Sequence, residues 1–160
     1  MTTAYDFELT TLSGKPMPLA AWRGRPLVIV NTASACALTP QYAGLEALWR
    51  EYKDRGLVVI GVPCNDFGEQ EQDDADSIAA FCQHNYGIDF PMAAKHHVRG
   101  RDADPLFRWL AQEGGLLARP LWNFHKYLIA RDGGLAGWFS SLTPASAGRF
   151  RRKVRRLLDT

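Results

Sequence analysis

The residue with the most evident chemistry in this sequence is Cys36, which stands between an expected strand and an expected helix. The strand covers residues 27–30, and the helix begins near Thr39 and Pro40. Orphan backbone N–H groups and the positive end of a helix dipole stabilise an anion at such a position, so we expect a nucleophilic thiolate. The alternative is a small buried apolar residue, which is the common role of free cysteine. Position alone leaves both interpretations open.

The elements that position Cys36 follow from the hydrophobic pattern. Residues 27–30 and 57–62 are β-branched runs without alternation, typical of parallel strands buried on both faces. Between them we predict a helix with Thr39 as N-cap, Pro40 at its first position and Gly56 beyond its end. The apolar stripe of this helix consists of Tyr42, Leu45, Leu48, Trp49 and Tyr52.

The order of the remaining elements indicates the fold class. In chain order they are a hairpin over 5–9 and 16–19, helices over 74–84 and 104–112, a hairpin over 127–130 and 135–139, and a C-terminal helix. This order predicts one α/β domain over residues 1–160 with a thioredoxin-like fold, in which a central mixed β-sheet is flanked by helices and an N-terminal β-hairpin is added.

Composition places the chain among ordinary globular proteins. Of its 160 residues, 46% are hydrophobic and 22% are charged, which excludes collagen-like and wholly disordered chains. No apolar stretch approaches the roughly 20 residues that span a bilayer, so we expect no stable membrane insertion. The first ten residues lack a basic start and an apolar run, so we expect no secretory signal and a cytoplasmic location.

Basic residues gather in the C-terminal helix, between Arg149 and Arg156. Such a cluster is compatible with binding to nucleic acid or an anionic membrane. The spacing favours a solvated face instead, because apolar residues recur at helical intervals and would dock one side of the helix on the core. These apolar residues are Phe150, Val154, Leu157 and Leu158. We therefore expect no nucleic-acid partner.

Metal and nucleotide sites are not indicated. The four histidines, His84, His96, His97 and His125, lack a matching ligand set, and the adjacent pair would point to opposite faces of an extended segment. The three cysteines cannot all pair internally, which excludes a disulfide scaffold, and no CxxC or paired Cys/His spacing indicates structural zinc. The Gly114-Gly115 stretch lacks the strand and lysine of a phosphate loop.

Three segments of the chain resemble the signature blocks of the glutathione peroxidases, in family order: Asn31-Thr32-Ala33-Ser34-Ala35-Cys36, Cys64-Asn65-Asp66-Phe67-Gly68-Glu69-Gln70-Glu71 and Trp122-Asn123-Phe124. Phe90-Pro91-Met92 and the turn Arg131-Asp132-Gly133 extend the resemblance over nearly the whole chain. The resemblance implies that Cys36 is the peroxidatic cysteine and that Gln70, Trp122 and Asn123 are catalytic.

These residue types suit that chemistry. An indole N–H and two carboxamide N–H groups can hydrogen-bond a thiolate without neutralising it. Each residue has a plainer alternative: Gln70 as a solvated loop residue, Trp122 as a core aromatic and Asn123 as a turn former. The match of three blocks favours the catalytic interpretation.

The other two cysteines have different expected roles. In relatives that use thioredoxin, a resolving cysteine lies on the helix where this chain has Cys82, so the resemblance implies Cys82 as the candidate resolving cysteine. A disulfide with Cys36 requires Cα atoms within about 7 Å, which implies local unwinding of that helix. The alternative is that Cys82 only packs the helix. Cys64 matches a noncatalytic family cysteine, and we expect a structural role.

Several positions depart from the family pattern: Ala35, Ala37, Asp66, Glu69 and Gln72 stand where relatives often have lysine or another residue, glycine, glutamine, glycine and proline. The loop before Gln70 is therefore unusually acidic. Carboxylates near Cys36 would oppose ionisation of its thiol and repel glutathione, itself an anion. Rate and reductant preference are the properties that these departures affect.

The resemblance implies a thiol-dependent peroxidase that reduces hydrogen peroxide and organic or lipid hydroperoxides, with thioredoxin or glutathione as reductant and no metal or organic cofactor. It also implies a monomer, because only residues 114–121 precede the third block where tetrameric relatives carry an interface loop. Two other classes stay open: a peroxide sensor or relay that passes oxidation to a partner protein, and an interaction module with an inert Cys36. A peroxiredoxin active site is disfavoured, because Thr32 is four residues before Cys36 and the TxxC spacing is missing.

Overall fold

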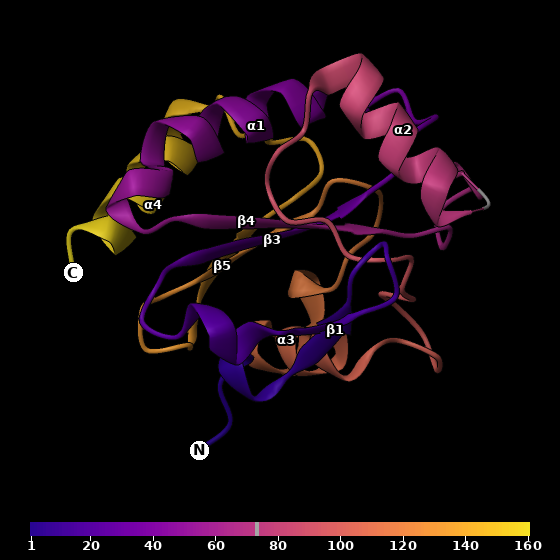
Figure 1. Cartoon of the computed structure of the whole chain (residues 1–160). Helices are drawn as coiled ribbons and strands as arrows, with labels where there is room; N and C mark the ends of the chain where they lie inside the picture. Colours follow the sequence, from indigo (N-terminus) through magenta and orange to yellow (C-terminus); the bar gives the residue numbers. More distant parts are fainter. Residues whose placement is uncertain (73) are drawn as a thin grey trace.

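The computed structural model describes residues 1–72 and 74–160 and has three layers. The central layer is a four-stranded sheet with the order β4-β3-β5-β6. Helices α1, α2 and α4 cover one face of the sheet, whereas α3 and the β1–β2 hairpin cover the other (Figure 1). The predicted thioredoxin-like arrangement of a mixed sheet between helices, with an added N-terminal hairpin, is confirmed.

The two apolar runs form the central strands, as predicted. Strand β3 (Leu27–Thr32) and strand β4 (Val58–Pro63) are parallel, and every residue in both strands is buried. Strand β5 (Lys126–Ile129) pairs antiparallel with β3 on its other side, and β6 (Leu135–Phe139) pairs antiparallel with β5. The carboxyl end of β3 therefore lies beside the start of β5, and the segments that flank Cys36 and Trp122 meet there.

The helix after Cys36 begins later than its capping signal predicts. Helix α1 spans Gln41–Tyr52, and its N-cap position is Pro40, which has no side-chain capping bond. The prediction of Thr39 as N-cap is wrong, because the Thr39 hydroxyl bonds instead to the Cys36 loop, accepting from the backbone N–H of Cys36 and donating to the carbonyl of Ala33. The backbone reaches the helix through a tighter turn, with the N–H of Thr39 bonded to the carbonyl of Cys36.

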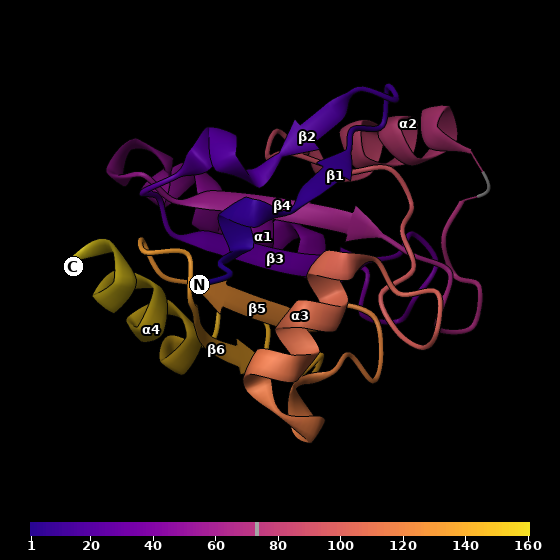
Figure 2. The ribbon, with the colours of Figure 1, turned by 90° about the horizontal axis from the view of Figure 1, so that it is seen from below.

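The next two helices begin at the predicted positions. Helix α2 (Ala75–Tyr86) is capped by Asp74, and helix α3 (Pro105–Gly114) is capped by Asp104. Each capping carboxylate accepts a hydrogen bond from a backbone N–H in the first turn of its helix. Helix α4 (Gly148–Leu158) buries the four apolar residues expected of it. Figure 2 shows the sheet from the α3 side, with the hairpin near β4 and α3 near β5 and β6.

The N-terminal hairpin is shorter than predicted. Strands β1 (Glu8–Thr10) and β2 (Pro16–Pro18) pair as expected, but Tyr5 lies in a short 3-10 turn, η1 (Ala4–Asp6). The Tyr5 hydroxyl donates to the carbonyls of Arg25 and Arg131, which explains its departure from the strand. Three further 3-10 turns are η2 (Leu19–Trp22), η3 (Lys53–Arg55) and η4 (Leu116–Ala118).

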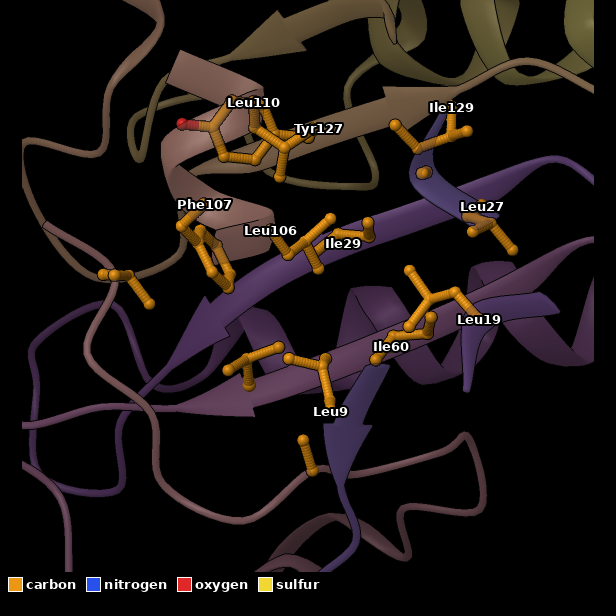
Figure 3. Packing of buried hydrophobic residues seen from close by; sticks show 14 of the residues in the cluster. Leu9, Leu19, Leu27, Ile29, Ile60, Leu106, Phe107, Leu110, Tyr127 and Ile129 are labelled. Carbon is orange, nitrogen blue, oxygen red and sulfur yellow. The ribbon is translucent and has the colours of Figure 1, made fainter. Parts of the chain in front are cut away.

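One hydrophobic core lies on each face of the sheet. Figure 3 shows the core on the α3 side, where Ile29 and Ile60 of the sheet face Leu106 of α3 and Leu9 of the hairpin. The second core joins Val28 and Val30 to the apolar faces of α1, α2 and α4. A rigid sheet packed on both faces gives the loops at the ends of β3 and β4 a fixed base. Among the described residues, no helix has the length and apolar character to cross a membrane.

Candidate active site

Cys36 lies in the loop between β3 and α1 and is only 7% exposed. The backbone N–H of Cys36 donates to Thr39 Oγ1 at 2.9 Å, and that hydroxyl donates to the carbonyl of Ala33 at 2.8 Å. Thr39 therefore closes the loop across its base. The predicted position at the carboxyl end of a buried strand is confirmed.

Two N–H donors converge on the sulfur of Cys36. The indole Nε1 of Trp122 lies 3.2 Å from Sγ, and the backbone N of Leu38 lies 3.3 Å from it. N–H donors directed at a sulfur atom stabilise negative charge that develops on it. Leu38 precedes Pro40, the N-cap residue of α1, so this donor belongs to the turn before the helix and not to the helix N-terminus that the position of Cys36 predicted.

The turn that carries Trp122 is held by Asn31 at the end of β3. Asn31 Nδ2 donates to the carbonyl of Trp122 at 3.0 Å, and Asn31 Oδ1 accepts from the N–H of His125 at 3.1 Å. The carbonyl of Asn31 accepts from the N–H of Phe124 at 2.7 Å, and Phe124 adopts a left-handed φ of 67°. This turn presents the Trp122 side chain, 38% exposed, to Cys36.

Gln70 and Asn123 lie together, but neither makes a hydrogen bond to Cys36 within the part of the chain that the structure describes. Asn123 Nδ2 donates to Gln70 Oε1 at 3.2 Å, and Asn123 is fully buried. The carbonyl of Gln70 accepts from the N–H groups of Ser34 and Ala35, at 3.0 and 2.8 Å. Gln70 is thus tied to the Cys36 loop by its backbone, and of the three predicted side-chain donors only Trp122 contacts the sulfur.

The acidic loop before Gln70 is fastened to residues 97–99. Asp66 accepts hydrogen bonds from His97 Nδ1 at 2.8 Å and from the N–H of Val98 at 2.7 Å. Asp66 raises the pKa of His97 through this hydrogen bond and its charge. The Asp66 carboxylate is therefore satisfied by the segment 97–99. Gly68 has a φ of 73°, a left-handed conformation that favours glycine, although a Cβ there would meet Trp122 and Gln70 only at the ordinary contact distances of 3.5 and 3.6 Å.

Glu71 is a buried carboxyl next to the Cys36 loop. It forms a short hydrogen bond with the hydroxyl of Ser34, and its N–H donates to Asn65 Oδ1 at 2.8 Å. Burial raises the pKa of Glu71, and the Ser34 hydrogen bond opposes that change. The backbone N–H of Ser34 also donates to the carbonyl of Gln70. Glu71 therefore helps to hold the Cys36 loop against the segment that carries Gln70.

The three cysteines of the chain are all free and buried. Cys64 lies between Asn31 Nδ2 and Asn123 Oδ1, 3.9 Å from each, and burial raises its pKa to about 12. Cys82 lies on α2 in the second core, and burial raises its pKa to about 11. Both environments keep the thiols neutral, whereas Cys36 alone has two donors directed at its sulfur.

The histidines are distributed over separate contacts. His96 Nδ1 lies 2.7 Å from the carbonyl of Ala94, His97 pairs with Asp66, and His125 is buried against Trp138. Within residues 1–72 and 74–160 there is no group of three or more His, Cys, Asp or Glu side chains arranged to hold a metal ion.

Comparison with known proteins identifies the family. The family model described as glutathione peroxidase matches residues 4–111. A glutathione peroxidase-like peroxiredoxin of Chlamydomonas reinhardtii is 48% identical over 145 residues, which cover 89% of this chain and 90% of that protein. The chain belongs to the glutathione peroxidase family. It is therefore a thiol-dependent peroxidase, as the sequence blocks implied.

Other relatives of this glutathione peroxidase agree in sequence and structure. A glutathione peroxidase-like peroxiredoxin of Saccharomyces cerevisiae is 43% identical over 150 residues, covering 92% of each chain. The crystal structure of Trgpx in its apo form superimposes with a TM-score of 0.80 and 33% identity, covering 99% of this chain and 97% of that one. A thioredoxin-family thiol:disulfide interchange protein from Chlorobium tepidum, 18% identical with a TM-score of 0.71, shares the fold.

Several residues that build the site in this glutathione peroxidase were not assigned roles from sequence. Asn31, Thr39 and Glu71 each make side-chain hydrogen bonds that position a loop beside Cys36. Asn31 had a detectable signal, because it is a polar residue at the end of an otherwise apolar, buried strand. Thr39 was predicted as a helix cap, which obscured its role in the Cys36 loop. For Glu71, no local pattern distinguishes a buried carboxyl from a solvated one.

Proposed function

We propose that Cys36 is the peroxidatic nucleophile of this enzyme and that Trp122, Gln70 and Asn123 assist it. The observation that carries the proposal is the convergence of Trp122 Nε1 and the Leu38 N–H on Cys36 Sγ, at 3.2 and 3.3 Å. These donors stabilise the thiolate before the reaction without transferring a proton to it.

In the proposed step, the thiolate of Cys36 attacks the nearer oxygen of a hydroperoxide. A sulfur–oxygen bond forms while the oxygen–oxygen bond breaks, and the leaving oxygen takes up a proton to become an alcohol or water. The sulfur is oxidised by two electrons and becomes a sulfenic acid. Negative charge moves from sulfur to oxygen during this step, so donors beside Sγ also reach the charge that develops on the leaving oxygen.

Gln70 and Asn123 are proposed to supply carboxamide donors to that charge. Gln70 Oε1 already accepts from Asn123 Nδ2, so the Nε2 group of Gln70 is the end of the amide that remains to donate. The buried Asn123 orients Gln70, and the backbone bonds from Ser34 and Ala35 keep Gln70 beside the loop of the nucleophile. This arrangement supports a positioned donor in place of a solvated side chain.

Cys82 is proposed as the resolving cysteine. Its thiol would attack the sulfenic sulfur of Cys36, form a disulfide and release water. Cys82 is buried in the α2 core and forms no disulfide with Cys36 in this structure, so part of α2 must unwind before the two sulfurs meet. The free energy that this opening costs is limited, because only two residues of α2, Ile78 and Cys82, are buried.

A dithiol such as thioredoxin, or two molecules of glutathione, would then restore the thiols, so the reaction needs no metal or organic cofactor. We propose that the enzyme acts as a monomer in the cytoplasm, where three free cysteines are compatible with the reducing conditions. Gel filtration tests the monomer, and a stable tetramer would contradict it.

The decisive experiment is stopped-flow oxidation of the reduced protein by hydrogen peroxide, followed by mass spectrometry without reduction. Wild type, Cys36→Ser, Cys82→Ser and Cys64→Ser are compared. Fast oxidation that requires Cys36 and ends in a Cys36–Cys82 disulfide supports the proposal, and Cys64→Ser should behave as wild type. A wild-type rate no faster than that of free cysteine overturns the role of Cys36, and a sulfenic acid that persists in wild type overturns the role of Cys82.

A further inference from the structure

Lys126 is a fully buried lysine that takes no part in the steps proposed for Cys36 and Cys82. It is the first residue of β5, and in the sheet it pairs with Val30 of β3 and Phe139 of β6. An apolar side chain would be more favourable in such surroundings, because burial of an amino group is strongly unfavourable unless the group is paired. A lysine at this position therefore indicates a requirement other than packing.

The amino group of Lys126 is committed to one backbone carbonyl. Nζ donates a hydrogen bond to the carbonyl oxygen of Phe124, and it makes no ion pair with a carboxylate of residues 1–72 or 74–160. Burial lowers the pKa of Lys126 to about 7. The amine and the ammonium both carry N–H groups, so the bond to Phe124 is available in either state.

Phe124 has a backbone conformation that its surroundings must hold. Its φ of 67° is left-handed, which an aromatic residue rarely adopts. Such a residue persists only where the rest of the structure fixes it. The N–H of Phe124 donates to the carbonyl of Asn31 at 2.7 Å, and its ring packs edge-on against Tyr42, with centroids 5.3 Å apart. Lys126 adds the bond to the carbonyl of the same residue.

The turn at Phe124 carries the indole that contacts the reactive sulfur. Trp122 stands two residues before Phe124, and its Nε1 lies 3.2 Å from Cys36 Sγ. The Asn31 side chain holds the residues on either side, through the Trp122 carbonyl and the His125 N–H. Without Lys126, the Phe124 carbonyl would be buried without this donor, and the turn would relax to satisfy it. The direction of the indole therefore depends on Lys126.

We propose that Lys126 is a positioning residue of the peroxidatic site, whose amino group fixes the left-handed turn at Phe124 and thereby directs the Trp122 indole at Cys36. The proposal rests on the peroxidatic role of Cys36 and gives Lys126 an indirect part in the reaction, through Trp122.

The first test is Lys126→Met, which removes the N–H donors and keeps an unbranched side chain. We expect single-turnover oxidation of Cys36 by hydrogen peroxide to slow about 10-fold, because the hydrogen bond from the indole to sulfur is weakened. Lys153→Met is the matched control, since Lys153 is a half-buried lysine of α4 outside this turn. It should keep the wild-type rate.

A double-mutant cycle separates positioning of the indole from general damage to the fold. In a Trp122→Phe background there is no indole N–H to direct, so Lys126→Met should slow oxidation by about 2-fold or less. Damage that does not act through the indole would slow oxidation to the same extent in both backgrounds. Equal slowing in wild type and Trp122→Phe overturns the proposal.

Nuclear magnetic resonance of ¹⁵N-labelled tryptophan side chains gives a measurement that does not depend on activity. The Trp122 indole signal is identified by its absence from Trp122→Phe. We expect Lys126→Met to shift this signal and to leave the signals of Trp22 and Trp49 in place, whereas Lys153→Met should shift none of the three. If Lys126→Met does not fold, Lys126→Leu, which also lacks an N–H donor, replaces it in each measurement.

The failures are distinguishable. If hydrogen peroxide oxidises the wild type no faster than it oxidises free cysteine, the peroxidatic role of Cys36 fails, while the indole signal still reports whether Lys126 directs Trp122. If the wild type reacts fast and Lys126→Met keeps both the wild-type rate and the Trp122 signal, the role of Lys126 is overturned.

Discussion

The side chain of Asn31 holds the backbone of Trp122, with 3.0 Å between Asn31 Nδ2 and the Trp122 carbonyl oxygen. This bond joins the end of β3 to the turn that presents the indole. The Cys36 loop follows the same strand, so β3 positions both the nucleophile and its indole donor. Because β3 is buried on both faces, the distance between sulfur and indole is set by the sheet, not by two independent loops.

The indole hydrogen bond predicts a loss of rate in Trp122→Phe. Phenylalanine keeps an aromatic ring but removes the N–H that lies 3.2 Å from Cys36 Sγ. A hydrogen bond to a charged group contributes about 1.5–3 kcal/mol, so oxidation of Cys36 should slow about 10- to 100-fold. Stopped-flow oxidation with hydrogen peroxide measures this. Trp49→Phe is the matched control, because Trp49 packs on α1 beneath Lys53 and should leave the rate unchanged.

A second prediction concerns Asn31→Ala. The variant leaves the Trp122 carbonyl and the His125 N–H without their side-chain partner, which should lower the free energy of unfolding by about 2–4 kcal/mol. It should also slow Cys36 oxidation, since the turn is no longer held. Urea unfolding and stopped-flow oxidation measure the two effects. Asn85→Ala, which removes an exposed hydrogen bond to the Phe81 carbonyl, should change stability by about 0.5 kcal/mol or less. Equal effects of the two variants would contradict the role of Asn31.

The sequence predicted the parts of the fold that depend on local patterns. Residues 27–30 and 57–62 are uniformly apolar because both faces of their strands are buried, and their parallel pairing was correctly expected. Asp74 and Asp104 begin helices as predicted because each carboxylate meets N–H groups of its own first turn.

The errors arise where a residue bonds to a distant part of the chain. The Tyr5 hydroxyl contacts Arg131, and a contact across 126 residues leaves no trace in a local pattern. Thr39 carries a capping signal, yet its hydroxyl is used by Cys36 and Ala33. The pairing of Gln70 with Asn123 likewise depends on how β4 and β5 lie on either side of β3, so residue types indicated the donors but not which of them contacts sulfur.

The burial of Cys82 predicts a change in α2 upon oxidation. With a pKa of about 11, roughly one Cys82 thiol in a thousand is ionised at pH 8, so iodoacetamide should label it slowly in the reduced protein. After one equivalent of hydrogen peroxide, we expect faster amide hydrogen exchange across residues 75–86 in wild type, because the disulfide requires an open helix. Cys82→Ser should show no such change. Formation of the disulfide with unchanged exchange in α2 would contradict local unwinding.

The last prediction concerns the pH dependence that His125 gives to stability. Its folded pKa of about 4 lies below the usual 6.5, so between these values the unfolded chain binds more protons than the folded one. The contribution is complete above pH 6.5 and is lost as the pH falls to about 4. A shift of this size corresponds to about 3 kcal/mol in the free energy of unfolding.

His125→Phe isolates this contribution, because it removes the titrating ring while keeping an aromatic contact with Trp138. His97 and Glu71, whose pKa values are raised, give pH dependences of the opposite sign, but both residues are present in wild type and variant. The difference between the two proteins in urea unfolding should therefore change by about 3 kcal/mol between pH 6.5 and pH 4, with the variant losing less stability. At pH 7 the variant should be at least as stable, since it lacks the unpaired Nε2. Parallel pH profiles would mean that His125 is protonated in the folded protein and already has a partner for its charge.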